Sequence, residues 1–133
     1  MNDKSMQDTV ALVGRIALAL IFIVSGFGKI TGFEGTAGYM AKGGLPMPEV
    51  LLVLTILIEL GGGLMIAAGY KARWAALAIA AFIVPVTLVF HNPIGADRVN
   101  MIMFMKNISI IGGMLMVYAF GPGAWSLDAR KNA

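Results

Sequence analysis

Cysteine is absent from this 133-residue chain, which excludes disulfide bonds, thiol redox centres and thiolate metal sites. The chain also has a single histidine, His91, so a haem held by two histidines of the same chain is excluded. We therefore expect no metal site and no intrinsic cofactor. Any redox chemistry would need a diffusible carrier or a group on a partner.

Charged residues are scarce. They make up 13% of the chain, whereas hydrophobic residues make up 59%, and in a soluble domain about a quarter of the residues are charged. This balance predicts an integral membrane protein with the lipid bilayer as its solvent. The net charge of +3 is not concentrated in a basic run, so nucleic-acid binding is not expected.

Four long apolar runs are each able to cross a membrane, since a hydrocarbon core of about 30 Å needs roughly 20 helical residues. They cover about residues 10–30, 50–69, 74–90 and 101–120. A helix satisfies every backbone hydrogen bond within its own segment, as a bilayer requires. We predict an all-α integral membrane four-helix bundle that forms a single domain over residues 1–133.

The piece between the first two runs is too short to span. Its residues Phe33, Ala37, Tyr39 and Met40 predict a short helix that lies in the interface. Four spans place both termini on one side, which carries Lys4, Lys71, Arg73, Arg130 and Lys131. The opposite loops carry fewer basic residues, so we expect both termini in the cytoplasm.

Glu59 lies near the middle of the second run, within the stretch LIELGGGLMIAAG. A charge at mid-membrane costs at least about 2.5–3.5 kcal/mol and normally faces the bundle interior, where it is paired. We expect Arg15 and Lys106 to reach the depth of Glu59 and to form a central polar cluster with it. Lys29 and His91 lie near the outer ends of their runs and would form an outward vestibule.

This predicted ligand-binding cluster has two interpretations. Glu59 is either part of a structural salt bridge that fixes the helix register, or part of a site that binds a ligand or handles protons. Arg15, Lys29 and Lys106 supply more positive charge than Glu59 balances. A cavity of this kind suits an anionic ligand or the oxygens of a quinone head group. His91 could bind a metal, relay protons or cap its helix. The residues single out no catalytic group.

Three motifs, taken in order, resemble the DoxX family: GRIALALIFIVSGFGKI in the first run, ELGGGLMIAAGYKARWAAL across the second and third, and a closing GPGAWSLD. The resemblance extends from Gly14 to Asp128. It implies a small four-span protein of the bacterial inner membrane, in a family linked to quinol oxidase and other membrane oxidoreductase assemblies. The family's positions fall on Arg15, Gly26, Lys29, Glu59, Gly62, Gly69, Lys106, Gly113 and Asp128.

We therefore expect an accessory or quinone-interacting subunit of a membrane redox system, with quinone as the ligand and a peripheral oxidoreductase as partner. Self-association is also expected, because one four-helix bundle exposes much small-residue surface. The chain is at most a subunit of an enzyme, since no self-contained catalytic site is recognisable. The alternatives are a small transporter or channel for an anionic or neutral metabolite, and a non-catalytic assembly factor.

Overall fold

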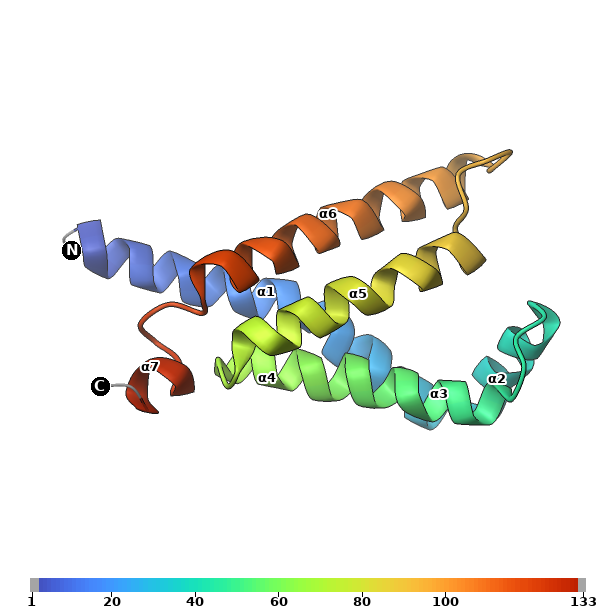
Figure 1. Cartoon of the computed structure of the whole chain (residues 1–133), viewed down its shortest axis with the longest axis horizontal. Coiled ribbons are helices and arrows are strands. Elements are labelled where there is room, and N and C mark those ends of the chain that lie inside the picture. Colours follow the sequence, from blue (N-terminus) through green and yellow to red (C-terminus); the bar gives the residue numbers. More distant parts are fainter. Residues whose placement is uncertain (1–2, 132–133) are drawn as a thin grey trace.

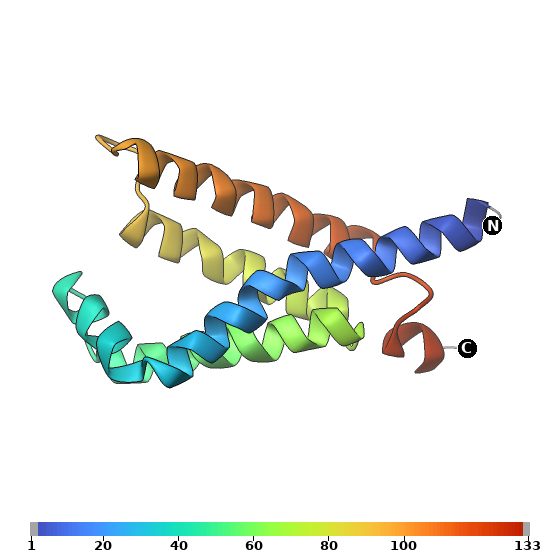
Figure 2. The same cartoon turned by 180° about the vertical axis from the view of Figure 1, so that it is seen from behind.

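The protein folds into helices joined by short connections, as a computed structural model that describes residues 3–131 shows (Figures 1 and 2). Four helical spans are long and apolar enough to cross a bilayer. The first is α1 (Asp3–Thr31). The second is one continuous rod of α3 (Pro48–Ile56), the π-helical turn η1 (Leu57–Gly61) and α4 (Gly62–Ala68). The third and fourth are α5 (Ala72–Phe90) and α6 (Arg98–Phe120), and the short helices are α2 (Phe33–Lys42) and α7 (Leu127–Lys131).

The predicted all-α, four-span architecture and the short helix between the first two spans are confirmed. Local chemistry explains the helix ends. Pro48 stands in the first turn of α3, where its missing N–H has no helical partner to lose. Gly69 ends α4 with a φ of 72°, a left-handed conformation that glycine adopts readily. The Asp97 carboxylate accepts the Asn100 N–H at 2.8 Å and caps α6.

Small residues let the spans approach closely. A methyl group added to Gly26 of α1 would lie 2.8 Å from Cβ of Leu60 in η1, and one added to Gly62 would lie 2.9 Å from Cδ1 of Ile79 in α5. Alanines on the inner face of α5 complete the core. Since lipid removes the hydrophobic drive for helices to associate, close packing of this kind holds membrane bundles together. The buried core comprises Ala19, Phe22, Ile66, Ala75, Ala76, Ile79, Ala80, Ile83 and Met114.

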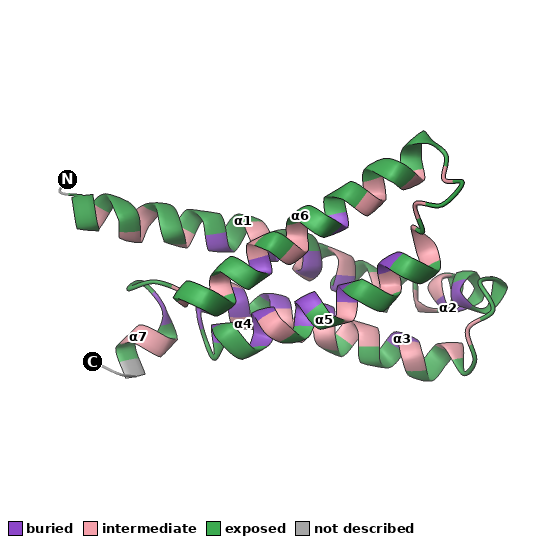
Figure 3. Cartoon of the chain, turned by 45° about the horizontal axis from the view of Figure 1, so that its top comes forward, coloured by how far each residue is buried: buried purple, intermediate pink, exposed green. Residues whose placement is uncertain are grey.

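The spans form two pairs. α1 packs against α4 and η1, α6 packs along α5, and α4 joins the pairs by packing against α5. Figure 1 shows the α5–α6 pair diverging from α3 and α2 toward the end of the molecule that carries α2. Buried positions concentrate where α1, α4 and α5 cross, whereas the start of α1 and the outer half of α6 are largely exposed (Figure 3).

The C-terminal helix α7 docks on the turn between α4 and α5. The Asp128 carboxylate accepts the backbone N–H of Lys71 at 2.7 Å and that of Ala72 at 3.0 Å, while its own N–H donates to the carbonyl of Gly69 at 2.9 Å. Because Asp128 satisfies free amides at the start of α5, it caps that helix from a distant point in the sequence. α7 and the start of α1 therefore lie at the same end of the bundle (Figure 1).

Candidate functional site

Glu59 lies in the one segment where the second span departs from α-helical geometry. The π-helical turn η1 runs from Leu57 to Gly61, and Glu59 is its buried residue. Single π turns inside α-helices are frequent at functional sites. The turn sits against α1, where Gly26 allows the backbone at Leu60 to come close. The fold thus holds the carboxylate between two spans and away from lipid.

Lys29 is the partner of this carboxylate. Its Nζ lies 2.8 Å from Oε1 of Glu59 and 3.3 Å from Oε2. Lys29 also donates to the Ser25 hydroxyl at 2.6 Å, and that hydroxyl donates to Glu59 Oε1 at 3.2 Å. Ser25 and Lys29 are one helical turn apart on α1, so the two side chains meet on the same face. The result is a closed triangle of one acid, one base and one hydroxyl.

The triangle borders a cavity of about 200 Å³ at the end of the bundle that carries α2. Lys29 and Glu59 form one wall, His91 lies at the end of α5, and Tyr39 comes from α2. The ring of Tyr39 stacks on Phe90 with the centroids 5.5 Å apart, which ties α2 to the end of α5. The full lining is Lys29, Thr36, Tyr39, Met40, Thr55, Glu59, Phe82, Val86, Phe90 and His91.

A second, largely apolar cavity of about 300 Å³ lies beside the first. The two cavities share a wall, and the second extends between α3 and α5 past Leu54 and Val89, whose side chains are exposed on the lipid side. We refer to the two neighbouring cavities together as the α3–α5 groove; the first cavity is its polar inner part and the second its apolar outer part. The residues common to both cavities are Met40, Thr55, Phe82, Val86 and Phe90.

His91 is placed at the polar end of this groove, as a vestibule residue. Its Nδ1 lies 3.1 Å from Oδ1 of Asn100, so the ring connects the end of α5 to the first turn of α6. If that nitrogen carries the proton and donates to Asn100, Nε2 is the free acceptor. His91 also lines the cavity that Lys29 and Glu59 line.

Arg15 does not join Glu59, and the pairing that we expected from the sequence is wrong. Its guanidinium lies at the opposite end of the bundle and donates to the carbonyls of Ala67 at 3.2 Å and Trp125 at 2.9 Å, and also to that of Pro122. The reason is that Glu59 lies level with Lys29, and Arg15 precedes Lys29 by roughly 21 Å along α1, which places it level with the ends of α4 and α6. There it fastens the connection between α6 and α7.

Lys106 is also outside the cluster, although it lies on a span. Its neighbour Asn107 is buried and donates to the Thr87 hydroxyl at 2.9 Å, so this face of α6 turns toward α5. Lys106 falls on the exposed side of the helix. The expected contact with Glu59 fails because α6 packs along α5 with Asn107 on the packed face, which turns Lys106 outward. Among residues 3–131, Lys29 alone forms a salt bridge with Glu59.

The sequence did not predict that α2 lines the cavity or that Asn107 joins α6 to α5. Thr36 and Tyr39 line the cavity, but a short interfacial helix gave no sign of facing a buried site. The signal in the sequence at Asn107 is its amide, because a buried amide within a span needs a hydrogen-bonding partner on another helix. Thr87 is that partner.

Comparison with known proteins agrees with the family resemblance of the sequence motifs. Residues 10–92 match the sequence profile of the DoxX family. The chain is 44% identical over 129 residues to the inner membrane protein YqjF of Escherichia coli K12, covering 97% of each chain, and 39% identical over 128 residues to its inner membrane protein YphA, covering 93% of this chain and 91% of that one.

A more distant relative is the surfeit locus protein 4 homolog of Drosophila melanogaster. It is 28% identical over 139 residues, which cover 99% of this chain and 44% of that one. No solved structure matches. The family profile covers more than half of the residues, and the two bacterial relatives match along nearly their whole length. The chain is therefore an integral membrane protein of the DoxX family.

Proposed function

We propose that this protein binds the head group of a lipophilic quinone in the α3–α5 groove and serves as a membrane subunit of a quinone-linked redox system in the bacterial inner membrane. The observation that carries the proposal is the polarity of the groove. The Lys29–Glu59 pair lines its inner cavity, and the apolar outer cavity, bordered by the exposed side chains of Leu54 and Val89, adjoins it. A quinone has the same order of polarity, from head to tail.

The donor set at the inner end fits a quinone head. Lys29, Tyr39 and His91, whose side chains carry an ammonium, a hydroxyl and an imidazole, all line the cavity. These groups would hold the two carbonyl oxygens, which gain negative charge and then protons when a bound quinone is reduced. Glu59 fixes the Lys29 ammonium in place through the contact at 2.8 Å. A held cation beside developing negative charge is the usual way in which proteins favour such a change.

The size and access of the groove also support a lipid-soluble ligand. Ligand pockets usually have volumes of about 300–1,000 Å³ with apolar walls and a few placed polar groups. The two neighbouring cavities have volumes of about 200 and 300 Å³. A tail lying between Leu54 and Val89 would reach lipid directly, so the ligand could enter sideways from the bilayer and need not cross water.

A binding measurement tests the proposal. Purified protein in mild detergent is titrated with a ubiquinone analogue that has a ten-carbon tail, and the bound fraction is measured after rapid gel filtration. We expect saturable binding that weakens about tenfold or more in Glu59→Gln and Lys29→Gln, the loss that a charge-assisted hydrogen bond implies. Lys106→Gln is the matched control, because it removes an exposed ammonium from another span. Absence of saturable binding, or equal weakening in all three variants, would overturn the proposal.

Reconstitution separates the two rival functions. A transporter would move an anionic or neutral metabolite into liposomes in a manner that depends on Glu59, whereas a quinone-binding subunit would show no such flux. An assembly factor would show neither flux nor quinone binding, but would retain a stable protein partner. We also propose a peripheral oxidoreductase as such a partner, and self-association of the chain. A pull-down tests for the partner, and native mass spectrometry of the same preparation tests for the oligomer.

We place the start of α1 and the helix α7 on the cytoplasmic side. This end carries the basic residues Lys4, Lys71, Arg73 and Arg130, against the carboxylates of Asp3, Asp8 and Asp128, the last of which caps α5. The excess of basic residues favours this orientation. A reporter fused after residue 133 that is active only in the cytoplasm should be active, and one that is active only outside the inner membrane should not.

A further inference from the structure

A second groove lies at the opposite end of the bundle from the Lys29–Glu59 cavity, between the first half of α1 and the last turns of α6. Its volume is about 460 Å³ and its walls are mostly apolar. Gly14 contributes no side chain, and a methyl group added there would meet no described heavy atom within 4 Å. The lining residues of this α1–α6 groove are Ala11, Gly14, Arg15, Leu18, Gly113, Met116, Val117, Phe120, Gly121 and Pro122.

The groove is open to the lipid side and narrow at its floor. Met116 and Phe120 are 60% and 75% exposed, so nothing within the described chain covers them. Gly113 approaches Leu18 so closely that an added methyl group would lie 3.1 Å from Cδ1 of the leucine. The space is thus an apolar groove between two antiparallel spans, and its lining and volume suit a hydrocarbon chain.

A guanidinium stands at the end of this groove. Nε and Nη2 of Arg73 each lie 3.2 Å from the place where a methyl group on Gly121 would be, and Gly121 lines the groove. Arg73 is exposed, and no salt bridge pairs it with an acid within residues 3–131. A guanidinium matches a phosphate in planar, two-pronged fashion, and here no carboxylate of the described residues pairs with it.

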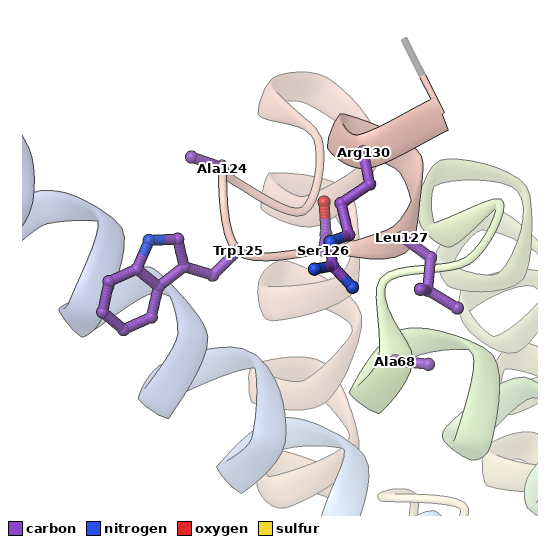
Figure 4. Close-up of a pocket in the computed structure, with 6 residues that line it drawn as sticks. All are labelled: Ala68, Ala124, Trp125, Ser126, Leu127 and Arg130. Carbon is purple, nitrogen blue, oxygen red and sulfur yellow. The ribbon is translucent and has the colours of Figure 1, made fainter. Parts of the chain in front are cut away.

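The surroundings of Arg73 mark the depth of lipid head groups. Trp74 and Trp125 are 68% and 53% exposed, and tryptophan is enriched where the bilayer meets water. Figure 4 shows Trp125 projecting to the α1 side of its loop, while Arg130 extends back from α7 alongside Ser126. Arg130 likewise has no acidic partner among the described residues. This rim is therefore cationic at the level where phosphates lie.

We infer that the α1–α6 groove binds one acyl chain of an anionic phospholipid, whose phosphate is held by Arg73. Basic sites between spans that adjoin an apolar groove are a recognised way in which membrane proteins select anionic lipids. The acyl chain of a zwitterionic lipid such as phosphatidylcholine would also fill the groove. Its head group, however, would place a second cation beside Arg73. This site is independent of the α3–α5 groove and does not rest on the proposed quinone function.

Native mass spectrometry tests the inference. Protein in mild detergent is incubated with equal amounts of phosphatidylglycerol and phosphatidylcholine of identical chains, and the bound lipids are counted. We expect phosphatidylglycerol to be retained roughly fivefold better, the preference that one basic residue near the surface supplies. Arg73→Gln should abolish the preference, whereas Arg98→Gln, which removes an exposed arginine at the other end of the bundle, should leave it unchanged.

The groove itself is tested by filling it. Gly14→Leu places a side chain in the groove and should reduce the retention of both lipids, whereas Gly28→Leu also faces open space on α1 but lies outside the groove and should reduce neither. An excess of inorganic phosphate should not displace the lipid. Equal retention of the two lipids, a wild-type pattern in Arg73→Gln, equal losses in both glycine variants, or displacement by phosphate alone would each overturn the inference.

Discussion

The ammonium of Lys29 lies 2.8 Å from Oε1 of Glu59, across the contact between α1 and the π-helical turn of the second span. The lysine side chain is 26% exposed and the glutamate side chain 10% exposed. The pair thus closes the core on one side and faces the polar end of the α3–α5 groove on the other. Both interpretations of Glu59, as part of a structural salt bridge and as part of a ligand site, therefore apply to this Lys29–Glu59 pair.

The structural contribution of this pair is measured by a double-mutant cycle. Glu59→Gln leaves the Lys29 ammonium without its counter-charge inside the bundle, which costs about 1–3 kcal/mol. Lys29→Met should cost a similar amount, and the double variant should cost less than the sum, with a coupling of about 0.5–3 kcal/mol. The free energies of unfolding are measured in detergent with increasing denaturant. Strictly additive losses would contradict the pairing.

Gly26 should be intolerant of any side chain. A methyl group added there would lie 2.8 Å from Cβ and 2.9 Å from the backbone N of Leu60, so Gly26→Ala forces α1 and η1 apart. We expect a loss of about 1–3 kcal/mol in the free energy of unfolding. The control is Gly28→Ala on the same helix, where the described chain leaves the space open, and it should be neutral or stabilising. Equal effects at the two positions would contradict the close approach.

Asp128 should stabilise the protein from outside the four spans. Asp128→Ala removes two hydrogen bonds to the first amides of α5 and should cost about 0.5–2 kcal/mol, as the loss of a helix cap does. It should also release α7, so that a protease cuts after Arg130 faster than in the wild type. Arg98→Ala, at the other end of the bundle, is the control. Unchanged proteolysis in Asp128→Ala would contradict the docking of α7.

The hydrogen bond between Asn107 and Thr87 should hold α6 to α5. Its length is 2.9 Å and both residues are buried. Asn107→Leu and Thr87→Val should each lower the free energy of unfolding by about 0.5–2 kcal/mol, the range for hydrogen bonds between spans. The double variant should be little worse than either single one. Lys106→Leu, one residue away on the exposed face, should instead be neutral or stabilising.

The architecture was predictable because bilayer length and backbone chemistry leave few choices. Apolar runs of about 20 residues gave the four spans, and the apolar positions between Phe33 and Met40 gave the short helix between the first two. α2 has the bounds Phe33–Lys42, and α1 begins at Asp3, earlier than the apolar run, since polar residues can continue a helix beyond the membrane. Hydropathy therefore predicts which residues lie within the membrane, but it does not predict where a helix ends.

The partners of Glu59 were less predictable, because they depend on how the helices are rotated and paired. Depth along a span placed Arg15 and Lys106 within reach of Glu59, but depth carries no information on which spans touch. In the structure α6 packs along α5, so Lys106 is exposed, and Arg15 finds carbonyls at the other end. Lys29 was recognised as a vestibule residue, and it takes the place that we had given to those two.

Labelling of the groove tests the central claim most directly, because the natural chain contains no cysteine. Thr55 lines both cavities of the α3–α5 groove, so Thr55→Cys introduces a single thiol at their junction. The rate of its reaction with a small maleimide is measured with and without the ten-carbon-tailed quinone, beside Ser109→Cys on the exposed face of α6. We predict that the quinone slows labelling at position 55 in a saturable manner and leaves position 109 unchanged. Labelling at position 55 that the quinone does not slow would contradict the claim that this groove holds the head group.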